Sequence, residues 1–334
     1  MTAPEKAPRV AAVGAGRMGR GIAIAFAYAG HPVSLIDLRQ RGDAAWDKLA
    51  QEARAEIEGS LNGLAALGVL AREQVAAIAA RVQLVRASEA PRALAAAQLV
   101  FEGVPETLDA KREAFEHINA HCPEDAILTS TTSSILVTQI AQFVKRPERF
   151  LNIHWLNPAY VIPVVELSYH PGTDPAVIER AKSLMEEIGK LPVVCGPTPG
   201  YIVPRLQALV MNEAARMIEE GAATAQEIDK ATRYGLGLRF AALGVVEFID
   251  FGGADILHHA SREMSASIDP ARYQAPAILD RMMSEGRLGL KSGSGFYDYA
   301  GRDVAAYRGD VLLRTLGMLK HAGLWRAPAE ATRE

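Results

Sequence analysis

His154 and Glu166 are the two residues whose types and positions first suggest chemistry. They stand in HWLNPAYVIPVVEL, with the histidine at the end of one apolar run and the glutamate inside the next. An imidazole titrates near neutral pH and can move a proton, and a carboxylate inside an apolar run costs energy unless a partner satisfies it. The simpler interpretation is a silent structural histidine. Whether His154 acts with other groups depends on what the rest of the chain provides.

A glycine-rich segment near the N-terminus provides the second chemical signal. In RVAAVGAGRMGRGIAIAFAYAG, residues 9–30, a short apolar strand leads into Gly14, Gly16 and Gly19 and then into an alanine-rich helix. The first two glycines let the backbone approach a pyrophosphate at the helix N-terminus, and Gly19 permits close packing of helix on strand. This context predicts a dinucleotide site rather than a glycine-rich turn without a ligand.

The choice of dinucleotide depends on Asp37, which ends the next apolar strand, PVSLID. A carboxylate there can bond both ribose hydroxyls and repels a 2′-phosphate, so we expect NAD rather than NADP. Arg39 and Arg41 follow closely, and either could pair with a phosphate.

The elements that must position these residues predict an α/β fold. A stretch rich in Ala, Leu, Glu and Arg at about 43–80 predicts an inserted helical pair. Short apolar runs alternate with helical stretches, which is typical of a Rossmann-type, doubly wound, mostly parallel sheet. These runs are VQLV (82–85), LVFEGV (99–104), AILTST (126–131), FLNIHWL (150–156), VVEL (164–167) and PVVC (192–195).

The strand pattern stops at GPTPG (196–200), and helical periodicity follows it. We therefore predict two domains, a nucleotide-binding domain over 1–196 and an all-helical substrate and dimerisation domain over 199–334. A chain of 334 residues is long enough for both.

The composition limits which binding partners and which cellular compartment we expect. The net charge of −3 and the absence of basic runs argue against nucleic acid. Cys122 and Cys195 lie far apart, without the spacing of a disulfide framework or a zinc site. No signal-length or membrane-spanning apolar segment is evident, so we expect a soluble, cytoplasmic protein with neither a membrane nor a metal as partner.

Seven motifs in order resemble the L-3-hydroxyacyl-CoA dehydrogenase family over about 290 residues. They are VGAGRMGRGIA, Asp37, EGVPE, STTSSI, HWLNP with VVEL, PGYIVPRL and GLKSGSGFYDY. The resemblance implies a Rossmann-type domain followed by a helical domain that supplies much of a dimer interface. It also implies reversible NAD-dependent oxidation of an L-3-hydroxyl to a ketone, on a small hydroxyacyl-CoA or hydroxy-acid substrate.

The resemblance assigns catalytic roles to three residues. His154 matches the base that takes the hydroxyl proton, and Glu166 matches the acid that holds the other ring nitrogen. Ser133, in STTSSI, matches the serine that hydrogen-bonds the substrate oxygen.

Other positions match contacts to the cofactor. Asn157 matches an asparagine near the nicotinamide ribose, and Arg17 and Met18 lie within the glycine loop. Glu106 and Lys111 in ETLDAK, and Lys291 in GLKSGSGF, match further contacts. For the two lysines an ordinary solvated side chain is the alternative, since lysine is usually exposed.

Three departures from the family pattern concern the substrate. Pro204 stands where members usually have an asparagine, and proline cannot donate a hydrogen bond. The segment 60–71, where CoA-ester enzymes carry lysines, keeps a matching Ser60 but has no basic residue. Arg239, in YGLGLRFAALG, replaces a Gly-Pro-rich turn and could grip a carboxylate, or form only a structural ion pair.

Two substrate classes therefore stay open, a short CoA ester and a free hydroxy acid like those of the gulonate, carnitine and pyridine-carboxylate branches. The alternative that is not an enzyme is a catalytically idle cofactor-binding or structural protein with the same fold. A metal-dependent hydrolase is weaker, because the adjacent His258 and His259 have no third ligand at the usual spacing.

Overall fold

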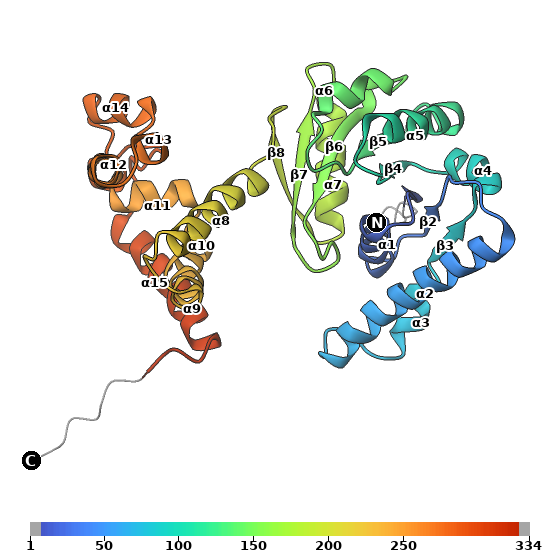
Figure 1. The fold of residues 1–334 in the computed structure, drawn as a ribbon, viewed down its shortest axis with the longest axis horizontal. Helices are drawn as coiled ribbons and strands as arrows, with labels where there is room; N and C mark the ends of the chain where they lie inside the picture. The colour runs from blue at the N-terminus through green and yellow to red at the C-terminus, as the bar shows by residue number, and fades with distance from the viewer. Residues whose placement is uncertain (1–7, 327–334) are drawn as a thin grey trace, which may run out of the picture. The chain divides into compact units, whose positions relative to one another are not determined.

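The computed structural model describes residues 8–326. Within them a sheet of eight strands forms the frame of the nucleotide-binding region (Figure 1). The strands are β1 (Val10–Val13), β2 (Val33–Ile36), β3 (Val82–Val85), β4 (Leu99–Glu102), β5 (Ile127–Ser130), β6 (Phe150–Trp155), β7 (Val164–Tyr169) and β8 (Leu191–Cys195). Each apolar run in the sequence forms a strand, which confirms the predicted α/β class.

The strand order is β3-β2-β1-β4-β5-β6-β7-β8. Strands β1 to β6 pair in parallel, whereas β7 runs antiparallel to β6 and parallel to β8. The first six strands have the order of a doubly wound dinucleotide fold, in which ligands bind at the carboxyl ends of the strands. The antiparallel β7 places its beginning beside the end of β6.

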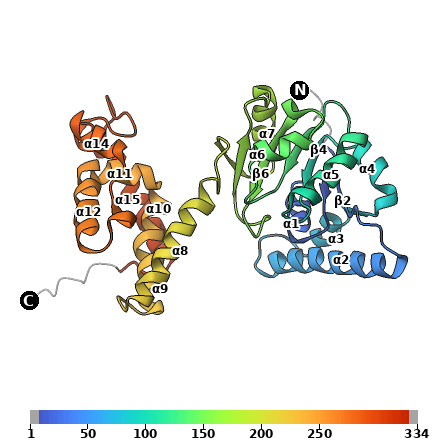
Figure 2. The same cartoon turned by 45° about the horizontal axis from the view of Figure 1, so that its top comes forward.

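The sheet is buried on both faces, which explains why its strands are continuous apolar runs. Side chains of β1 alternate between two hydrophobic clusters, with Val10 and Ala12 in one and Ala11 and Val13 in the other. Helices α1, α2, α3 and α7 contribute to the first cluster, and α4, α5 and α6 contribute to the second. Figures 1 and 2 show these two helical layers on opposite sides of the strands.

The helices of this region begin and end close to sequence signals. Asp174 caps α7 through the Ala176 amide, and Thr107 caps α5 through the Ala110 amide. The helices are α1 (Arg17–Tyr28), α2 (Asp43–Ala66), α3 (Gln74–Ala79), α4 (Ala90–Ala95), α5 (Leu108–His121), α6 (Val137–Ile140) and α7 (Pro175–Glu187).

The described chain forms two compact units that divide between Val210 and Met211, inside helix α8 (Val203–Glu219). In its described part, the second unit is helical and contains no strand, as predicted. Its further elements are α9 (Ala225–Ala231), a π-helical turn η4 (Thr232–Gly237), α10 (Leu238–Ala242), α11 (Val245–Gly252), α12 (Ala254–Ser267), α13 (Pro270–Tyr273), α14 (Ala277–Ser284), η5 (Leu290–Ser292) and α15 (Val304–His321).

Between residues 8 and 326, no helix is long and apolar enough to cross a membrane.

Candidate active site

A cleft of about 770 Å³ opens at the carboxyl ends of β1, β2 and β4. This volume lies within the range of roughly 300–1,000 Å³ that small-molecule and cofactor sites occupy. Predicted cofactor residues in its lining are Gly14, Gly16, Arg17, Met18, Asp37 and Asn157. Gly19, Glu106, Lys111 and Ser133 are not among its lining residues.

The glycine loop has the backbone that close approach to a dinucleotide requires. Gly14 has a φ of 111°, and a Cβ there would meet the Gly103 carbonyl oxygen at 2.5 Å. A Cβ on Gly19 would meet the Gly14 carbonyl oxygen at 2.0 Å, so helix α1 packs too closely on the loop for any side chain. A Cβ on Gly16 would instead enter open space at the start of α1, where a pyrophosphate is favoured. The residues present therefore fit NAD.

Asp37 follows β2 at the rim of the same cleft and is largely buried. Its carboxylate accepts a hydrogen bond from the Arg41 guanidinium and a long one, 3.4 Å, from the Arg39 amide. Arg41 is thus engaged by the carboxylate in this arrangement. Both arginines nevertheless line the cleft.

His154 and Glu166 are directly opposite each other in the antiparallel β6–β7 pair. The His154 Nδ1 atom lies 2.8 Å from Glu166 Oε2, and the two residues are 6% and 0% exposed. An ionised carboxylate can only accept, so Nδ1 carries a hydrogen, and in the neutral imidazole Nε2 then has the lone pair. No described residue hydrogen-bonds Nε2. The strand register therefore brings together two residues that are twelve positions apart in the sequence.

The second oxygen of Glu166 binds the beginning of α8. Oε1 accepts hydrogen bonds from the Ile202 and Val203 amides at 2.9 and 2.8 Å. Burial alone would raise the pKa of Glu166, but the His154 hydrogen bond and these two amides outweigh burial, so the pKa is lowered. Glu166 is therefore a stable anion beside the imidazole.

Ser133 lies in the loop that follows β5, and it is exposed. Strand β5 is the parallel neighbour of β6, with Ser130 opposite Asn152, so this loop emerges beside the strand that carries His154. The Ser133 hydroxyl is 3.4 Å from Glu106 Oε1. The sheet thus brings Ser133 and His154 to the same edge.

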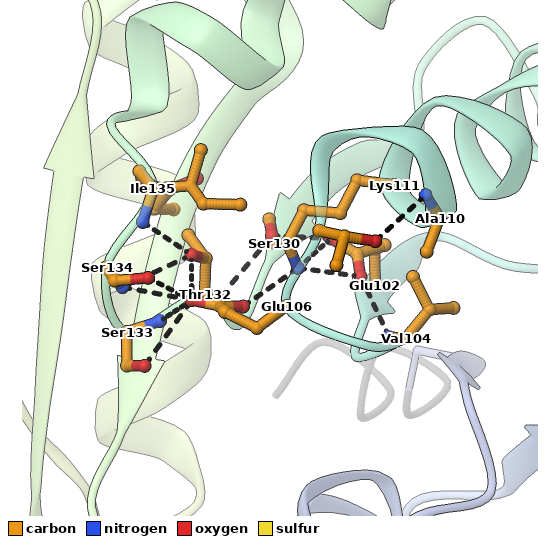
Figure 3. A network of polar contacts seen from close by, with 12 residues as sticks. Glu102, Val104, Glu106, Ala110, Lys111, Ser130, Thr132, Ser133, Ser134 and Ile135 are labelled. Carbon is orange, nitrogen blue, oxygen red and sulfur yellow. Dashed lines mark hydrogen bonds and ion pairs between the residues drawn. The ribbon is translucent and has the colours of Figure 1, made fainter.

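Glu106 anchors the Ser133 loop (Figure 3). Its Oε1 accepts from the amides of Ser133 and Ser134 at 2.8 and 3.0 Å and from the Thr132 hydroxyl at 2.5 Å. Burial opposes ionisation, but these donors and the Lys111 ammonium prevail and lower the pKa of Glu106 to about 2. The carboxylate is therefore ionised at neutral pH.

Lys111 is fully buried on α5, between two carboxylates. Its Nζ lies 3.1 Å from both oxygens of Glu102 and 3.3 Å from Glu106 Oε2. Glu102, at the end of β4, also accepts from the Ser130 hydroxyl and from the Val104 amide at 2.5 and 2.8 Å. Figure 3 shows Lys111 lying between Glu102 and Glu106. This geometry favours an indirect role for Lys111, through Glu106.

Two predicted site residues lie in the second unit. Lys291, in η5, forms an ion pair with Asp255, whose nearest oxygen lies at 2.5 Å. Arg239 is exposed and lies 5.8 Å from the centre of the Phe248 ring. It is the second residue of α10, two positions after the π-helical turn η4 ends, and such turns occur often at functional sites.

Pro204 is accommodated without loss of a backbone hydrogen bond. It is the second residue of α8, where the first amides have no partner within the helix. Glu166 accepts hydrogen bonds from the Ile202 and Val203 amides, and the Arg205 amide donates to the Gly200 carbonyl oxygen at 3.0 Å. Proline fits here because it has no amide hydrogen to satisfy.

Sequence reasoning assigned no role to Tyr201, Glu102 or Asn152. Tyr201 stacks on His154, and Asn152 bonds the Tyr201 hydroxyl. The one available signal was polarity inside an apolar run, as in LVFEGV and FLNIHWL. That signal does not identify a partner.

Comparisons with known proteins agree with this geometry. Residues 9–198 match the model of the 3-hydroxyacyl-CoA dehydrogenase NAD binding domain, and residues 200–299 match that of the 3-hydroxyacyl-CoA dehydrogenase C-terminal domain. A 3-hydroxybutyryl-CoA dehydrogenase of Bradyrhizobium diazoefficiens is 33% identical, over 88% of this chain and 96% of that protein. A 5-formyl-3-hydroxy-2-methylpyridine 4-carboxylate 5-dehydrogenase of Mesorhizobium japonicum is 29% identical, over 90% and 94%.

Among solved structures, a 3-hydroxyacyl-CoA dehydrogenase of Archaeoglobus fulgidus has a TM-score of 0.73 and 29% identity. The match covers 95% of this chain and 100% of that one. The resemblance seen in the sequence is thereby confirmed. The chain belongs to the 3-hydroxyacyl-CoA dehydrogenase family, and it is an NAD-dependent oxidoreductase that acts on CH–OH groups.

Proposed function

We propose that the protein reversibly oxidises a secondary 3-hydroxyl to a ketone, with His154 as general base. The observation that carries this proposal is the buried pair of His154 Nδ1 and Glu166 Oε2 at 2.8 Å, near the carboxyl ends of the strands that form the dinucleotide cleft. A silent structural histidine would not need an ionised partner aligned on one nitrogen while the other nitrogen is left without a protein partner.

The proton step follows from the tautomer. The hydroxyl proton of the substrate moves to Nε2 of His154, and the Glu166 carboxylate stabilises the imidazolium that forms. Bound NAD would supply the acceptor for the hydride that leaves the hydroxyl-bearing carbon. In the reductive direction His154 returns the proton to the carbonyl oxygen. Ser133 donates a hydrogen bond to the substrate oxygen and so holds it near Nε2.

Cofactor binding rests on the cleft and its rim. The start of α1 would hold the pyrophosphate, and Asp37 would hold the adenosine ribose hydroxyls. Asn157, which follows β6, lines the cleft, and it would contact the nicotinamide half. Lys291 remains a predicted cofactor contact of the second unit.

The substrate that we favour is a free hydroxy acid whose carboxylate binds Arg239. Support comes from the exposed guanidinium next to a π-helical turn and from the lack of basic residues in 60–71, where a CoA phosphate would need them. The Mesorhizobium relative is itself named as an enzyme of a pyridine carboxylate. A short CoA ester is the second candidate, favoured by the name of the Bradyrhizobium relative.

A substrate panel tests the proposal. NADH consumption is followed with acetoacetyl-CoA and with free 3-keto acids, and NADH formation with the corresponding free 3-hydroxy acids. Arg239→Met should lower kcat/KM for a carboxylate substrate roughly 10- to 150-fold, because one charge-assisted contact contributes about 1.5–3 kcal/mol. Arg233→Met is the matched control, since Arg233 is an exposed arginine in the adjacent π-helical turn η4.

Three outcomes of this panel are informative. Efficient turnover of acetoacetyl-CoA by both wild type and Arg239→Met would replace the free-acid assignment with the CoA-ester one. An equal loss in Arg233→Met would make the effect of Arg239 nonspecific. NAD binding without turnover of any panel member would favour a catalytically idle protein.

We also propose a homodimer. Helices α8 and α15 expose large apolar side chains, with Leu209 64%, Met211 61%, Leu312 57% and Leu313 68% exposed. Such surfaces are usually covered by another protein surface. A monomeric mass in sedimentation equilibrium at micromolar concentration would contradict this assignment.

A further inference from the structure

Tyr201 lies where three parts of the candidate site meet. It follows the GPTPG segment between β8 and α8, and only 4% of its surface is exposed. Its ring contacts His154, and its hydroxyl contacts the Ser133 loop. The amides of the two residues that follow it bind Glu166. None of these contacts follows from the glycine loop or from the His154–Glu166 pair alone.

The ring of Tyr201 lies flat on the imidazole of His154. Their centres are 4.8 Å apart, and their planes differ by 14°. Glu166 fixes one edge of the imidazole by a single hydrogen bond, which still permits the ring to tilt about that bond. A face-on aromatic neighbour restricts this tilt, so the two contacts together define the direction of the Nε2 lone pair.

The Tyr201 hydroxyl connects the loop that follows β5 to strand β6. It donates to the Thr132 carbonyl oxygen at 2.8 Å and accepts from Asn152 Nδ2 at 3.1 Å. Burial raises the pKa of the Tyr201 phenol well above its usual range, so the hydroxyl remains a donor. Thr132 directly precedes Ser133, and its own hydroxyl faces Glu106 (Figure 3). The Ser133 loop is therefore held from both sides.

The backbone at Tyr201 is unusual for a bulky residue. Its φ of 47° is the one positive value among the described non-glycine residues, and left-handed conformations are unfavourable for side chains with a Cβ. This conformation turns the chain so that the next two amides, those of Ile202 and Val203, reach Glu166 Oε1. The contacts of the ring and the hydroxyl keep Tyr201 in place despite the cost.

We infer that Tyr201 is a positioning residue that sets the mutual geometry of His154 and Ser133. The inference rests on the proposed function of these two residues as base and substrate-oxygen donor. Tyr201 touches neither substrate nor cofactor in this account. It acts by fixing the imidazole plane and by holding the carbonyl group that precedes Ser133.

The test compares Tyr201→Phe, which keeps the ring and removes the hydroxyl, with Tyr169→Phe. Tyr169 is on β7 and packs, partly buried, against the first hydrophobic cluster. Losing one or two neutral hydrogen bonds should lower kcat about 3- to 10-fold in Tyr201→Phe, with the Kd for NAD unchanged. Tyr169→Phe should stay within about twofold of wild type.

A double-mutant cycle separates positioning from general destabilisation. If Tyr201 acts through the Ser133 loop, Tyr201→Phe should cost less than about twofold in a Ser133→Ala background. Tyr201→Leu, which also removes the ring, should lower kcat further in either background, because the imidazole then loses its stacking partner. Equal costs of Tyr201→Phe in both backgrounds would overturn the inference.

Hydrogen exchange gives a second measurement that needs no substrate. Deuterium uptake over 131–136 should rise in Tyr201→Phe and stay unchanged over the α7 segment. If wild type turned over no substrate, the proposed function would fail while increased uptake would still support the anchoring role. Wild-type uptake together with wild-type kcat in Tyr201→Phe would overturn the anchoring role itself.

Discussion

Two carboxylates in the candidate site, Glu166 and Glu106, bind their surroundings in the same way. Each gives one oxygen to a cationic or titratable side chain and the other to two consecutive backbone amides. Glu166 joins His154 to the beginning of α8. Glu106 joins Lys111 to the Ser133 loop.

They differ in their partner and in their exposure. Glu166 is fully buried against an imidazole that gains a charge during the proposed reaction, whereas 38% of the Glu106 side chain is exposed and its partner, Lys111, takes no part in that reaction. We therefore propose that Glu166 takes part in the proton step and that Glu106 positions the Ser133 loop. The loss of activity on neutralising each carboxylate should therefore differ in size.

The largest effect is expected for Glu166→Gln. The amide cannot stabilise the imidazolium and can impose the wrong tautomer on His154, so kcat should fall by something on the order of 10²–10⁴. Binding of NAD, followed by fluorescence titration, should change little because Glu166 does not line the cleft. A loss of kcat no larger than that of Glu106→Gln would remove the distinction between the two carboxylates.

Lys111→Met should mainly reduce stability. It leaves the Glu102 carboxylate buried without its cation, which typically costs about 3–5 kcal/mol and should lower Tm by roughly 10 °C. The double variant Glu102→Gln/Lys111→Met removes both charges and should recover at least about half of that loss. Differential scanning calorimetry measures the Tm of both variants. A wild-type Tm in Lys111→Met would show that the ion pair does not stabilise the fold.

Glu106→Gln should have a smaller effect on activity than Glu166→Gln. Its side chain loses the charge that holds the Ser133 loop, so kcat/KM should fall roughly 10- to 150-fold, the equivalent of about 1.5–3 kcal/mol. Asp109→Asn, on the exposed first turn of α5, is the control and should leave kcat/KM unchanged. Wild-type kinetics in Glu106→Gln would show that the loop is positioned without this carboxylate.

Acid titration should give the smallest effect. The pKa of Glu106 is lowered from 4.5 to about 2, so its ionised form stabilises the fold above its ordinary pKa, and this contribution disappears as the pH falls from about 4.5 towards 2. Solvent screening keeps the contribution modest. The difference in urea midpoint between wild type and Glu106→Gln should shrink between about pH 5 and pH 3, and a constant difference would contradict the assignment.

Local signals in the sequence predicted most of the fold. Asp174, Pro175 and Gly189 mark the limits of α7, which spans Pro175–Glu187. Thr224, with a glutamate three positions later, is typical of a helix start, and its hydroxyl accepts from the Glu227 amide at the start of α9. These features depend on residues a few positions apart, so the sequence displays them directly. The strands were equally visible, because a sheet covered on both faces needs continuous apolar runs.

The parts of the site that depend on packing between distant segments were not visible. Lys111 suggested either a solvated lysine or a cofactor contact, and its burial between Glu102 and Glu106 follows from how α5 lies on β4. The contacts of Tyr201 require strand pairing and a left-handed backbone that tyrosine does not favour. His154 and Glu166 were recognised as a pair through family motifs, and the antiparallel register supplies the physical reason.

The most direct test of the central claim is the turnover of His154→Gln, measured with the best substrate from the panel alongside the Kd for NAD. A general base acts on the transition state and not on the adenosine half of the cofactor. The account therefore predicts a fall in kcat on the order of 10²–10⁴ with the Kd for NAD within about twofold of wild type. Wild-type turnover in His154→Gln would contradict it.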